Sequence, residues 1–495
     1  MLESSPFGVR GAIEGFYGAY YTFPERKDLI RFLGRHGFNF YLYGPKNDRQ
    51  HRMRWWDPYP FDILEQFGET IHVAEQSGVT FCYAISFGVP MNYASPDDFA
   101  VITRKFRDFY DRGCRSFGVL MDDVTDGFVH DVNRLHFQSA GRAHADICNR
   151  LFEWARSLDD SCTFYMCPTE YSGAAPFTAY LHDLGAALHP DVNVFYTGRE
   201  ISSRTITVQD VNGFAEAIGR APVIWDNYPV NDLLTRSEMH IGPLLGRDPG
   251  LSEVTRGIVS NVMTEEEASK IALHTIAEFE RHPDRYDPER AWKRSLLRIA
   301  GHASYEPLAR FAENSLRSCL QDEQAPEMTR LCARAISTLR RGESASQSEA
   351  VAALNRYLDV LDESCYHLKN RMQNLKLRDD LLPWIEALEA KFWAGRRAIL
   401  TLKAIETGLD YTAWLRVLDE LLIEIDRLPK SIGGNGVLEL AAYARERVAQ
   451  IAGSQVPPAE TPLTIGGLDS GPRGLQLPAA SSDQHEPGAA AAVAE

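Results

Sequence analysis

Short apolar runs alternate with amphipathic stretches along roughly the first 265 residues of the chain. The runs are rich in Val, Ile, Phe and Tyr, and most of them lack the strict alternation of a sheet with one exposed face. Strands that are buried on both faces have this pattern. The pattern predicts eight strands, at residues 8–14, 38–43, 80–86, 116–121, 163–167, 193–196, 221–225 and 257–260.

Amphipathic helices are predicted between most of these strands, most clearly at residues 24–35, 61–76, 96–112 and 134–157. Pro24 and Pro96 suit first helical turns, and Gly37, Gly78 and Gly113 suit helix ends. Eight βα units in this length favour an α/β fold, a (β/α)8 TIM-like barrel. A doubly wound open sheet is the competing fold, and the absence of a G-x-G-x-x-G turn after the first strand argues against it.

The pattern changes after about residue 285, where the strand-like runs end. Alternating steps of four and three predict one helix with a heptad seam, formed by Leu354, Leu358, Leu361, Cys365, Leu368, Met372 and Leu375. Pro383 and Pro429 are expected to punctuate later helices, and residues 433–436 to form a turn. We therefore predict a barrel at 1–285, an all-α helical bundle at 286–455, and a disordered tail at 456–495 that is rich in Pro, Gly, Ala and Ser.

Acidic residues outnumber basic residues by 68 to 52, which gives a formal net charge of −16. Such a surface repels phosphate backbones and anionic membranes, so neither nucleic acid nor a membrane is an expected partner. We expect no signal peptide, because no basic patch followed by an apolar run begins the chain. The eight cysteines are scattered without a CxxC pair, which is typical of reduced thiols in a cytoplasmic protein.

Polar residues follow strand after strand of the predicted barrel. The carboxyl ends of the strands share one rim, where barrel enzymes carry their active sites. The residues expected on this rim are Glu14, Gly15, Lys46, Asn47, Asp48, Asp122, Asp123, Glu170, Tyr171, Trp225, Asp226, Asn227, Asn231, Asp232 and Asn261. Such a ring suits a polyhydroxylated ligand, with aromatic side chains available to stack on a sugar face.

Asp122 and Asp123 are the sharpest feature, because two adjacent carboxylates follow an apolar strand. Most glycosidases use two carboxyl groups, and barrels usually place them on different strands. Neighbouring carboxylates suit substrate-assisted hydrolysis, in which the 2-acetamido oxygen of the sugar attacks the anomeric carbon. One carboxylate then orients the amide, and the other protonates the leaving oxygen.

Each of these features also has a purely structural interpretation. The Asp122–Asp123 pair could be a solvated loop or a helix cap, Lys46 a surface charge and Trp225 a core residue. Glu170 and Asp226 are expected to brace loops rather than take part in catalysis. A metal-dependent hydrolase is the other alternative, but no H-x-H or H-E-x-x-H spacing supports zinc, so no metal and no cofactor is expected.

The chain resembles glycoside hydrolase family 84, the family of O-GlcNAcases and bacterial β-N-acetylglucosaminidases. Six segments carry the resemblance in family order: GAIEGFYG at 11–18, YLYGPKND at 41–48, LMDD at 120–123, CPTEY at 167–171, YTG at 196–198, and VIWDN with a following ND at 223–232. Gly44, Asn47, Tyr196 and Thr125 depart from the family pattern. These differences affect the expected substrate preference rather than the reaction.

The resemblance implies a role for each site residue. Asp122 corresponds to the carboxylate that holds the acetamido group, and Asp123 to the general acid and base. Tyr171 is implied to lie near the acetamido group and Trp225 to form an aromatic wall. The residues implied to bind sugar hydroxyls are Gly15, Lys46, Asn227, Asp232 and Asn261.

The implied activity is retaining hydrolysis of terminal β-linked N-acetylglucosamine from glycoproteins, glycopeptides or glycosides through an oxazoline intermediate. The alternative function is a non-catalytic glycan-binding protein on a barrel scaffold. A homodimer is a further possibility, since the helical region carries an apolar seam beside the barrel.

Overall fold

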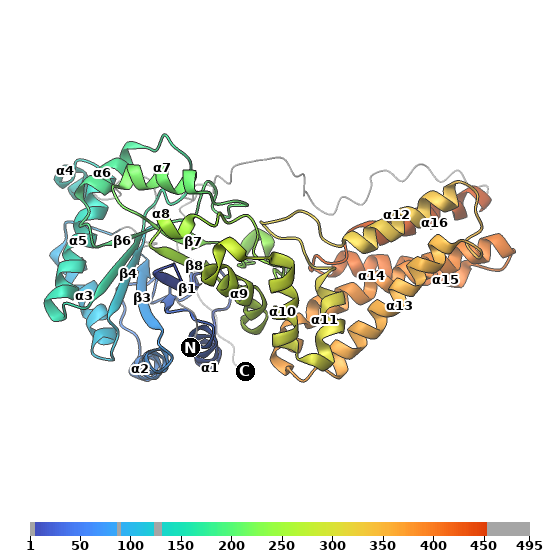
Figure 1. Cartoon of the computed structure of the whole chain (residues 1–495), viewed down its shortest axis with the longest axis horizontal. Helices are drawn as coiled ribbons and strands as arrows, with labels where there is room; N and C mark the ends of the chain where they lie inside the picture. Colours follow the sequence, from blue (N-terminus) through green and yellow to red (C-terminus); the bar gives the residue numbers. More distant parts are fainter. Residues whose placement is uncertain (1–4, 87–90, 123–130, 453–495) are drawn as a thin grey trace, which may run out of the picture. The chain divides into compact units, whose positions relative to one another are not determined.

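The computed structural model describes residues 5–86, 91–122 and 131–452. Eight parallel strands, paired in sequence order, close into a barrel (Figure 1). They are β1 Val9–Glu14, β2 Phe40–Tyr43, β3 Thr80–Ser86, β4 Ser116–Leu120, β5 Thr163–Cys167, β6 Asn193–Tyr196, β7 Val223–Asp226 and β8 Gly257–Asn261. Pairing of β1 with β8 closes the barrel, with Gly11 opposite Val259. The predicted (β/α)8 barrel is confirmed.

Helices follow the strands and surround the barrel in Figure 1. They are α1 Phe23–Arg35, α2 Phe61–Gln76, α3 Pro96–Tyr110, α4 Asp131–His136, α5 Ala140–Leu158, α6 Ala179–Ala187, α7 Val208–Ile218, α8 Leu251–Val254 and α9 Glu266–Arg281. Buried apolar side chains such as Phe40, Leu120 and Phe195 fill the barrel interior. The filled interior leaves the ends of the strands as the place for a ligand.

The single helix predicted at 134–157 is two helices in the structure. Helix α4 ends at His136, and α5 begins at Ala140. Ser139 between them has an extended backbone, and its side chain accepts a hydrogen bond from Arg142 N. Because serine is a strong N-cap, it begins a new helix within a continuous amphipathic pattern.

The region after the barrel is helical in the described residues. Its helices are α10 Pro288–Ala300, α11 Tyr305–Ala312, α12 Pro326–Arg340, α13 Glu349–Asn370, α14 Leu375–Thr407, α15 Thr412–Arg427 and α16 Gly436–Ala452. They share an apolar core that also includes Met239, Ile241 and part of α9, and a second core lies between the barrel strands and their helices. The architecture of a barrel followed by helices is therefore as predicted.

The heptad seam is correct only along α13. Leu354, Leu358, Leu361, Cys365 and Leu368 are all buried on this helix. The helix ends at Asn370, however, and Leu375 begins α14 with 55% of its surface exposed. The side chain of Asn374 accepts a hydrogen bond from Leu377 N and so caps the new helix. The prediction of one helix through Leu375 is wrong.

Pro383 was expected to punctuate a helix, but α14 continues through it. A proline in a helix interior removes a hydrogen bond and costs about 3 kcal/mol or more. Leu381, Trp384 and Ile385 beside it are buried in the helical core. Tertiary packing of this kind offsets a local loss of helix stability.

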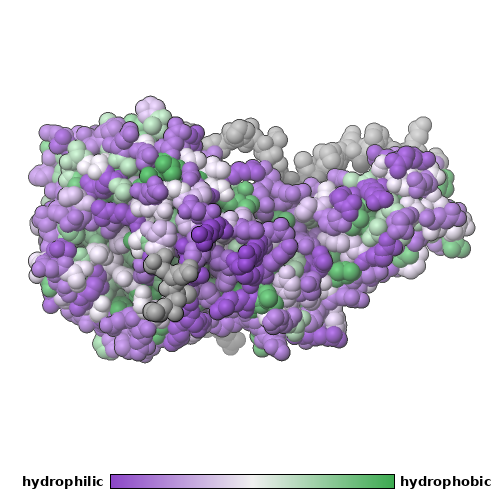
Figure 2. Space-filling model, viewed as in Figure 1, coloured by the Kyte–Doolittle hydropathy of each residue, from purple (hydrophilic) through white to green (hydrophobic). Residues whose placement is uncertain are grey.

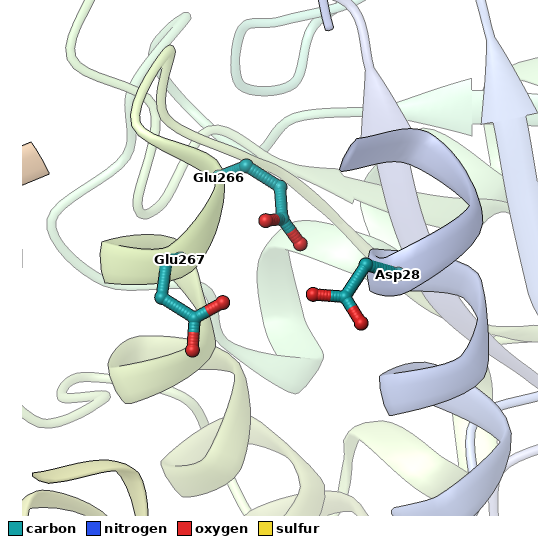
Figure 3. A group of neighbouring side chains, drawn as sticks. All are labelled: Asp28, Glu266 and Glu267. Carbon is teal, nitrogen blue, oxygen red and sulfur yellow. The ribbon is translucent and has the colours of Figure 1, made fainter. Parts of the chain in front are cut away.

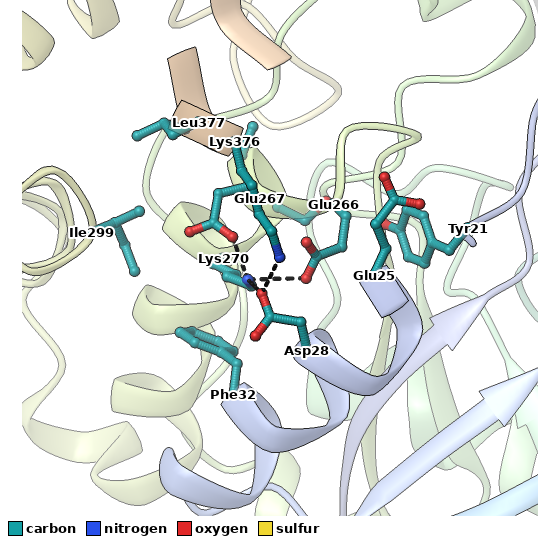
Figure 4. Close-up of polar contacts among 12 residues, drawn as sticks. Tyr21, Glu25, Asp28, Phe32, Glu266, Glu267, Lys270, Ile299, Lys376 and Leu377 are labelled. Atoms are coloured by element: carbon teal, nitrogen blue, oxygen red, sulfur yellow. Dashed lines mark hydrogen bonds and ion pairs between the residues drawn. The ribbon is translucent and has the colours of Figure 1, made fainter. Parts of the chain in front are cut away.

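An ion-pair cluster connects the barrel helices α1 and α9 to α14 (Figures 3 and 4). Asp28, Glu266 and Glu267 point toward one another, with oxygens within 4.8 Å. Lys270 Nζ lies 2.9 Å from Asp28 and 3.0 Å from Glu266, and it also pairs with Glu267. Lys376 of α14 binds the same Asp28 oxygen at 2.8 Å. The Lys270 ammonium thus supplies the positive charge that a metal ion would otherwise bring to these carboxylates.

Three carboxylates share two ammonium groups in this cluster, so one negative charge is in excess. Burial raises the pKa of Glu266 to about 8, against the opposing charge of Lys270. Burial also acts on Asp28, but hydrogen bonds from Lys376 and Lys270 and their charges lower its pKa to about 2. Below about pH 8, a proton on Glu266, which is 4% exposed, would remove the excess charge.

No helix in the described ranges is long and apolar enough to cross a membrane. The face drawn in Figure 2 is largely hydrophilic, with apolar residues in small groups.

Replacing Glu266 with glutamine should make stability less dependent on pH. The pKa of Glu266 is raised in the folded state, so the folded protein holds the proton more tightly than the unfolded chain does. The stabilisation of the fold by this proton is fully present below the unfolded pKa of 4.5 and is lost as pH rises through about 8. Glutamine stays neutral throughout. The melting temperature of Glu266→Gln minus that of the wild type should therefore increase between about pH 5 and pH 8 and stay constant above that range.

Thermal unfolding from pH 5 to pH 9 measures this difference, with the exposed Glu153→Gln exchange on α5 as the control for loss of one charge. Parallel curves for wild type and Glu266→Gln would show that Glu266 is ionised in the folded protein.

Candidate active site

Asp122 lies at the carboxyl end of β4, directly after the buried Met121. Its Oδ2 pairs with Lys46 Nζ, which comes from the loop after β2. The Asp122 side chain is 11% exposed and that of Lys46 is 3% exposed. The other oxygen, Oδ1, is buried and accepts no hydrogen bond from any described residue. One oxygen of this carboxylate is therefore held by a lysine, and the second is available to a donor on a ligand.

Asp123, the second member of the predicted catalytic pair, lies outside the described residues. The strand that leads to it is well defined, because Met121 N donates a hydrogen bond of 2.9 Å to Cys167 O on β5. Thr169 Oγ1 donates to Met121 O at 3.0 Å. The backbone up to the pair is thus bonded to the neighbouring strand and to the loop that follows it.

Four predicted site residues from β7, β8 and β1 form one hydrogen-bonded chain. Asn227 Oδ1 accepts from Trp225 Nε1 at 2.9 Å and from Asn261 Nδ2 at 3.0 Å. Asn261 Oδ1 accepts from Gly15 N at 3.2 Å. Asn227 Nδ2 donates to Ile201 O at 2.7 Å, which fixes the amide from the other side. The barrel therefore brings Gly15, Trp225, Asn227 and Asn261 together.

Trp225 lies against the backbone of Gly15. A Cβ atom at Gly15 would be 2.8 Å from Trp225 Cζ2 and 2.8 Å from Ile13 Cγ2. No side chain fits there without moving the indole. Trp225 also meets Phe195 of the barrel interior edge-on, with ring centroids 5.4 Å apart. Trp225 is 4% exposed, so it is a core residue. Its contact with Gly15 also places it beside the loop after β1.

Asp232 belongs to the loop after β7 and reaches the loop after β1. Its Oδ2 accepts a hydrogen bond of 2.8 Å from Tyr17 N. Gly18 N donates to Asn47 Oδ1 at 3.1 Å, which ties the first loop to the second. Tyr171, after β5, is partly buried and packs against the barrel interior, and its carbonyl accepts from Thr197 N at 2.9 Å. These contacts place Tyr171 and Asp232 on the same rim as Asp122.

The other rim carboxylates are bound by the protein itself. Glu14 receives a bidentate pair from Arg26 at 2.7 and 2.8 Å, and Asp226 receives one from Arg247 at 2.7 and 2.6 Å. The hydroxyls of two tyrosines, Tyr43 and Tyr59, each donate to Asp48 at 2.6 Å. Glu170 accepts from Thr178. These contacts connect the rim carboxylates to neighbouring parts of the protein, which agrees with the bracing role expected for Glu170 and Asp226.

Arg247 and Arg26 are contributors that sequence reasoning missed. Each neutralises a rim carboxylate, and each is almost fully buried, with 1% and 2% of its side chain exposed. Arg26 lies on the amphipathic helix α1, and Arg247 lies in an irregular loop. A buried arginine has no sequence signal there, since arginines on helices and in loops are usually exposed.

The chain is similar to proteins of known family. A family model described as beta-N-acetylglucosaminidase matches residues 10–313. Protein O-GlcNAcase from Rattus norvegicus is 35% identical over 272 residues, which are 54% of this chain and 29% of the rat protein. The chain thus spans less than a third of the length of that relative.

Solved structures of similar proteins agree with the family model. A mutant of the O-GlcNAc hydrolase of Thermobaculum terrenum has a TM-score of 0.83 and 28% identity, covering 91% of this chain and 97% of that chain. CpGH84B has a TM-score of 0.77 and 26% identity, covering 90% of this chain and 77% of that chain. The chain belongs to the β-N-acetylglucosaminidase family, glycoside hydrolase family 84.

Proposed function

We propose that this protein removes terminal β-linked N-acetylglucosamine from glycoproteins, glycopeptides or glycosides, with retention at the anomeric carbon. Asp122 carries the proposal. One of its oxygens is paired with Lys46, and the other is buried without a hydrogen-bond partner among the described residues. An acetamido N–H is a donor of the required kind, and burial strengthens its interaction with the carboxylate.

In the first step, the acetamido oxygen of the sugar bonds to the anomeric carbon while the bond from that carbon to the leaving oxygen breaks. Asp122 Oδ1 accepts the acetamido N–H and stabilises the positive charge that develops on the amide. Asp123, as a carboxylic acid, gives its proton to the leaving oxygen. The products of this step are the free aglycone and a protonated oxazoline, whose N–H stays hydrogen-bonded to the Asp122 carboxylate.

In the second step, the Asp123 carboxylate takes a proton from water, and the water oxygen bonds to the anomeric carbon. The oxazoline ring opens and restores the acetamido group. Two inversions at one carbon give overall retention. The sugar supplies the nucleophile, so the reaction needs a well-positioned amide rather than a second carboxylate nucleophile.

The remaining rim residues are proposed to bind the sugar. Asp232 and Lys46 are charged hydrogen-bonding partners for the sugar hydroxyls. The linked amides of Asn227 and Asn261 are neutral hydrogen-bonding partners for them. Gly15 lets the indole of Trp225 approach closely, so the indole can form a wall of the pocket. Tyr171 is proposed to contact the acetamido group. A ring of prepositioned polar groups around an aromatic surface is typical of sugar sites.

A reducing compartment such as the cytoplasm is proposed as the place of action. All eight cysteines are unpaired thiols, and seven of them are buried. The division into a barrel at 1–285, a helical bundle at 286–455 and a tail at 456–495 likewise stays a proposal. The change from alternating strands and helices to helices alone after α9 supports the first boundary.

Hydrolysis of an aryl β-N-acetylglucosaminide tests the function directly. Wild type should release the aryl group, and Asp123→Asn should lose roughly 10²–10⁴-fold in rate with poor leaving groups and less with activated ones. Asp122→Asn should also slow the reaction strongly. The control is Asp160→Asn, an exposed residue before β5 at the opposite end of the barrel. Binding of the sugar without turnover by wild type would favour the glycan-binding alternative.

Changing the acyl group of the substrate tests the nucleophile. A trifluoroacetamido substrate should react more slowly than the acetamido substrate with the same leaving group, because fluorine withdraws electrons from the attacking oxygen. The measurement is the slope of kcat/KM against the number of fluorine atoms. Rates that do not depend on fluorination would require a nucleophile from the protein instead.

A homodimer through the helical region is proposed as well. Helix α15 has many apolar residues, yet Leu418 is the one classed as fully buried, while Trp414 and Ile423 are exposed. Covering such a face in a second copy would remove apolar surface from water. Light scattering over a range of protein concentrations should show twice the monomer mass, and Ile423→Glu should shift the protein to monomer. A monomer mass for wild type at all concentrations would contradict the dimer.

A further inference from the structure

The loop that carries Asp232 has an unusual local structure. The 3-10 helix η1 Leu233–Thr235 follows Asp232 directly. Leu233 has a φ of 46°, a left-handed backbone that residues other than glycine rarely adopt. Leu233 and Leu234 are 52% and 82% exposed, so burial of their side chains does little to hold this backbone. A strained conformation of this kind persists only where the surroundings hold it.

Hydrogen bonds within the loop transmit any restraint to Asp232. Thr235 N and Thr235 Oγ1 donate to Asp232 O at 2.9 and 3.0 Å. Glu238 N donates to Thr235 O at 2.7 Å, and Asn231 Nδ2 donates to Glu238 O at 3.0 Å. Residues 231–238 are therefore linked into one bonded unit, and a restraint on its backbone limits where the Asp232 side chain can lie.

The helical region holds this unit at one carbonyl group. Ser237 O accepts a hydrogen bond of 2.9 Å from Trp384 Nε1 of α14 and a second of 2.7 Å from Ser431 N. Lys430 Nζ lies 3.5 Å from the centroid of the Trp384 ring and also contacts Arg236 O at 3.4 Å. Both lone pairs of one backbone oxygen are thus used by residues more than a hundred positions away in the sequence.

The anchoring groups are themselves buried or hydrogen-bonded. Trp384 is 1% exposed and lies in the helical core, which also includes Met239 and Ile241 at the end of the loop. The segment after Lys430 is fixed by the buried Lys391, whose ammonium donates to Ile432 O at 2.6 Å and to Gly434 O at 2.7 Å. Donors that are held by these contacts can restrain the loop at Ser237 O.

A second set of contacts fixes α14 to the barrel near its start. Asp380 accepts from Ala268 N at 2.9 Å, at the N-terminus of α9. Asn374 Nδ2 donates to Glu267 Oε1 at 2.8 Å, and Lys376 joins the ion-pair cluster of Figure 4. Trp384 therefore lies on a helix that is tied to α9, so its indole N–H has a defined position relative to the barrel.

We propose that Trp384 is a positioning residue for sugar binding: its hydrogen bond to Ser237 O holds the 231–238 unit so that the Asp232 carboxylate faces the sugar. This role rests on the proposed function, because it acts through a residue that is proposed to bind the substrate. The helical region then contributes to the reaction through the backbone of a barrel loop.

Trp384→Phe removes the indole N–H and keeps an aromatic ring in the core. The variant should raise KM for the aryl β-N-acetylglucosaminide about tenfold, the effect of one ordinary hydrogen bond, with a smaller change in kcat. The matched control is Trp292→Phe, because Trp292 Nε1 of α10 donates to Ile241 O at 2.7 Å in the same loop but beyond the bonded unit. This control should keep the wild-type KM.

Two further measurements separate positioning from general loosening. Hydrogen exchange of the amides in 231–238 should be faster in Trp384→Phe than in wild type or Trp292→Phe, whether or not substrate is present. In the Asp232→Asn background, Trp384→Phe should raise KM no further, because the residue through which it acts is already altered.

The possible results are distinct. A wild-type KM with wild-type exchange in Trp384→Phe would overturn the positioning role and leave the proposed function intact. Equal rises in KM for both tryptophan variants would also overturn it, since any loosening of the helices would then suffice. Absence of hydrolysis by well-folded wild type would overturn the proposed function and the positioning role together.

Discussion

A closed barrel of parallel strands puts all of its carboxyl ends on one rim, and the site depends on this constraint. Gly15 and Asn261 are 246 residues apart in sequence and share a hydrogen bond there. Lys46 and Asp122 are 76 residues apart and form an ion pair. The bond between Gly15 and Asn261 could not form on an open sheet whose first and last strands were separated. The Lys46–Asp122 pair joins the loops after β2 and β4, which lie on either side of β3. The pairing of β1 with β8 is thus a requirement for the site as much as for the fold.

The strands and the identity of the rim residues could be predicted from the sequence, because strands buried on both faces are continuous apolar runs and their ends are marked by polar residues. Which rim carboxylates are paired with arginine and which are not could not be predicted. Glu14 and Asp122 both follow an apolar strand, yet Glu14 is saturated by Arg26 and Asp122 keeps a buried oxygen open. Whether a carboxylate is paired depends on side chains from other elements of the chain. The residues next to each carboxylate in the sequence do not indicate these partners. The adjacency of Asp122 to Asp123 set it apart in the sequence, but the arginine partner of Glu14 could not be predicted.

The incorrect predictions in the fold have a common cause. The periodicity of apolar residues indicates which face of a helix is buried. It does not indicate where one helix ends and the next begins when both bury similar faces. Ser139 and Asn374 each cap a helix within a pattern that continues across the break. Pro383 shows the reverse case, in which a residue that usually ends a helix is overruled by burial on both sides. In each case a single capping or packing contact outweighs the pattern, and such contacts are visible only in three dimensions.

The helical region illustrates how far a site can extend beyond its pocket. A glycine at position 233 would adopt the left-handed backbone without strain, but it would also allow many other conformations. Leucine restricts those alternatives, at the cost of strain that something else must offset. The two hydrogen bonds to Ser237 O supply a restraint at the right place, because they act on the unit that contains Asp232. A backbone carbonyl has no sequence signature, so this dependence could not be predicted from the residues of the loop. In the role proposed for Trp384, the helical region affects sugar binding through this backbone and places no side chain against the sugar.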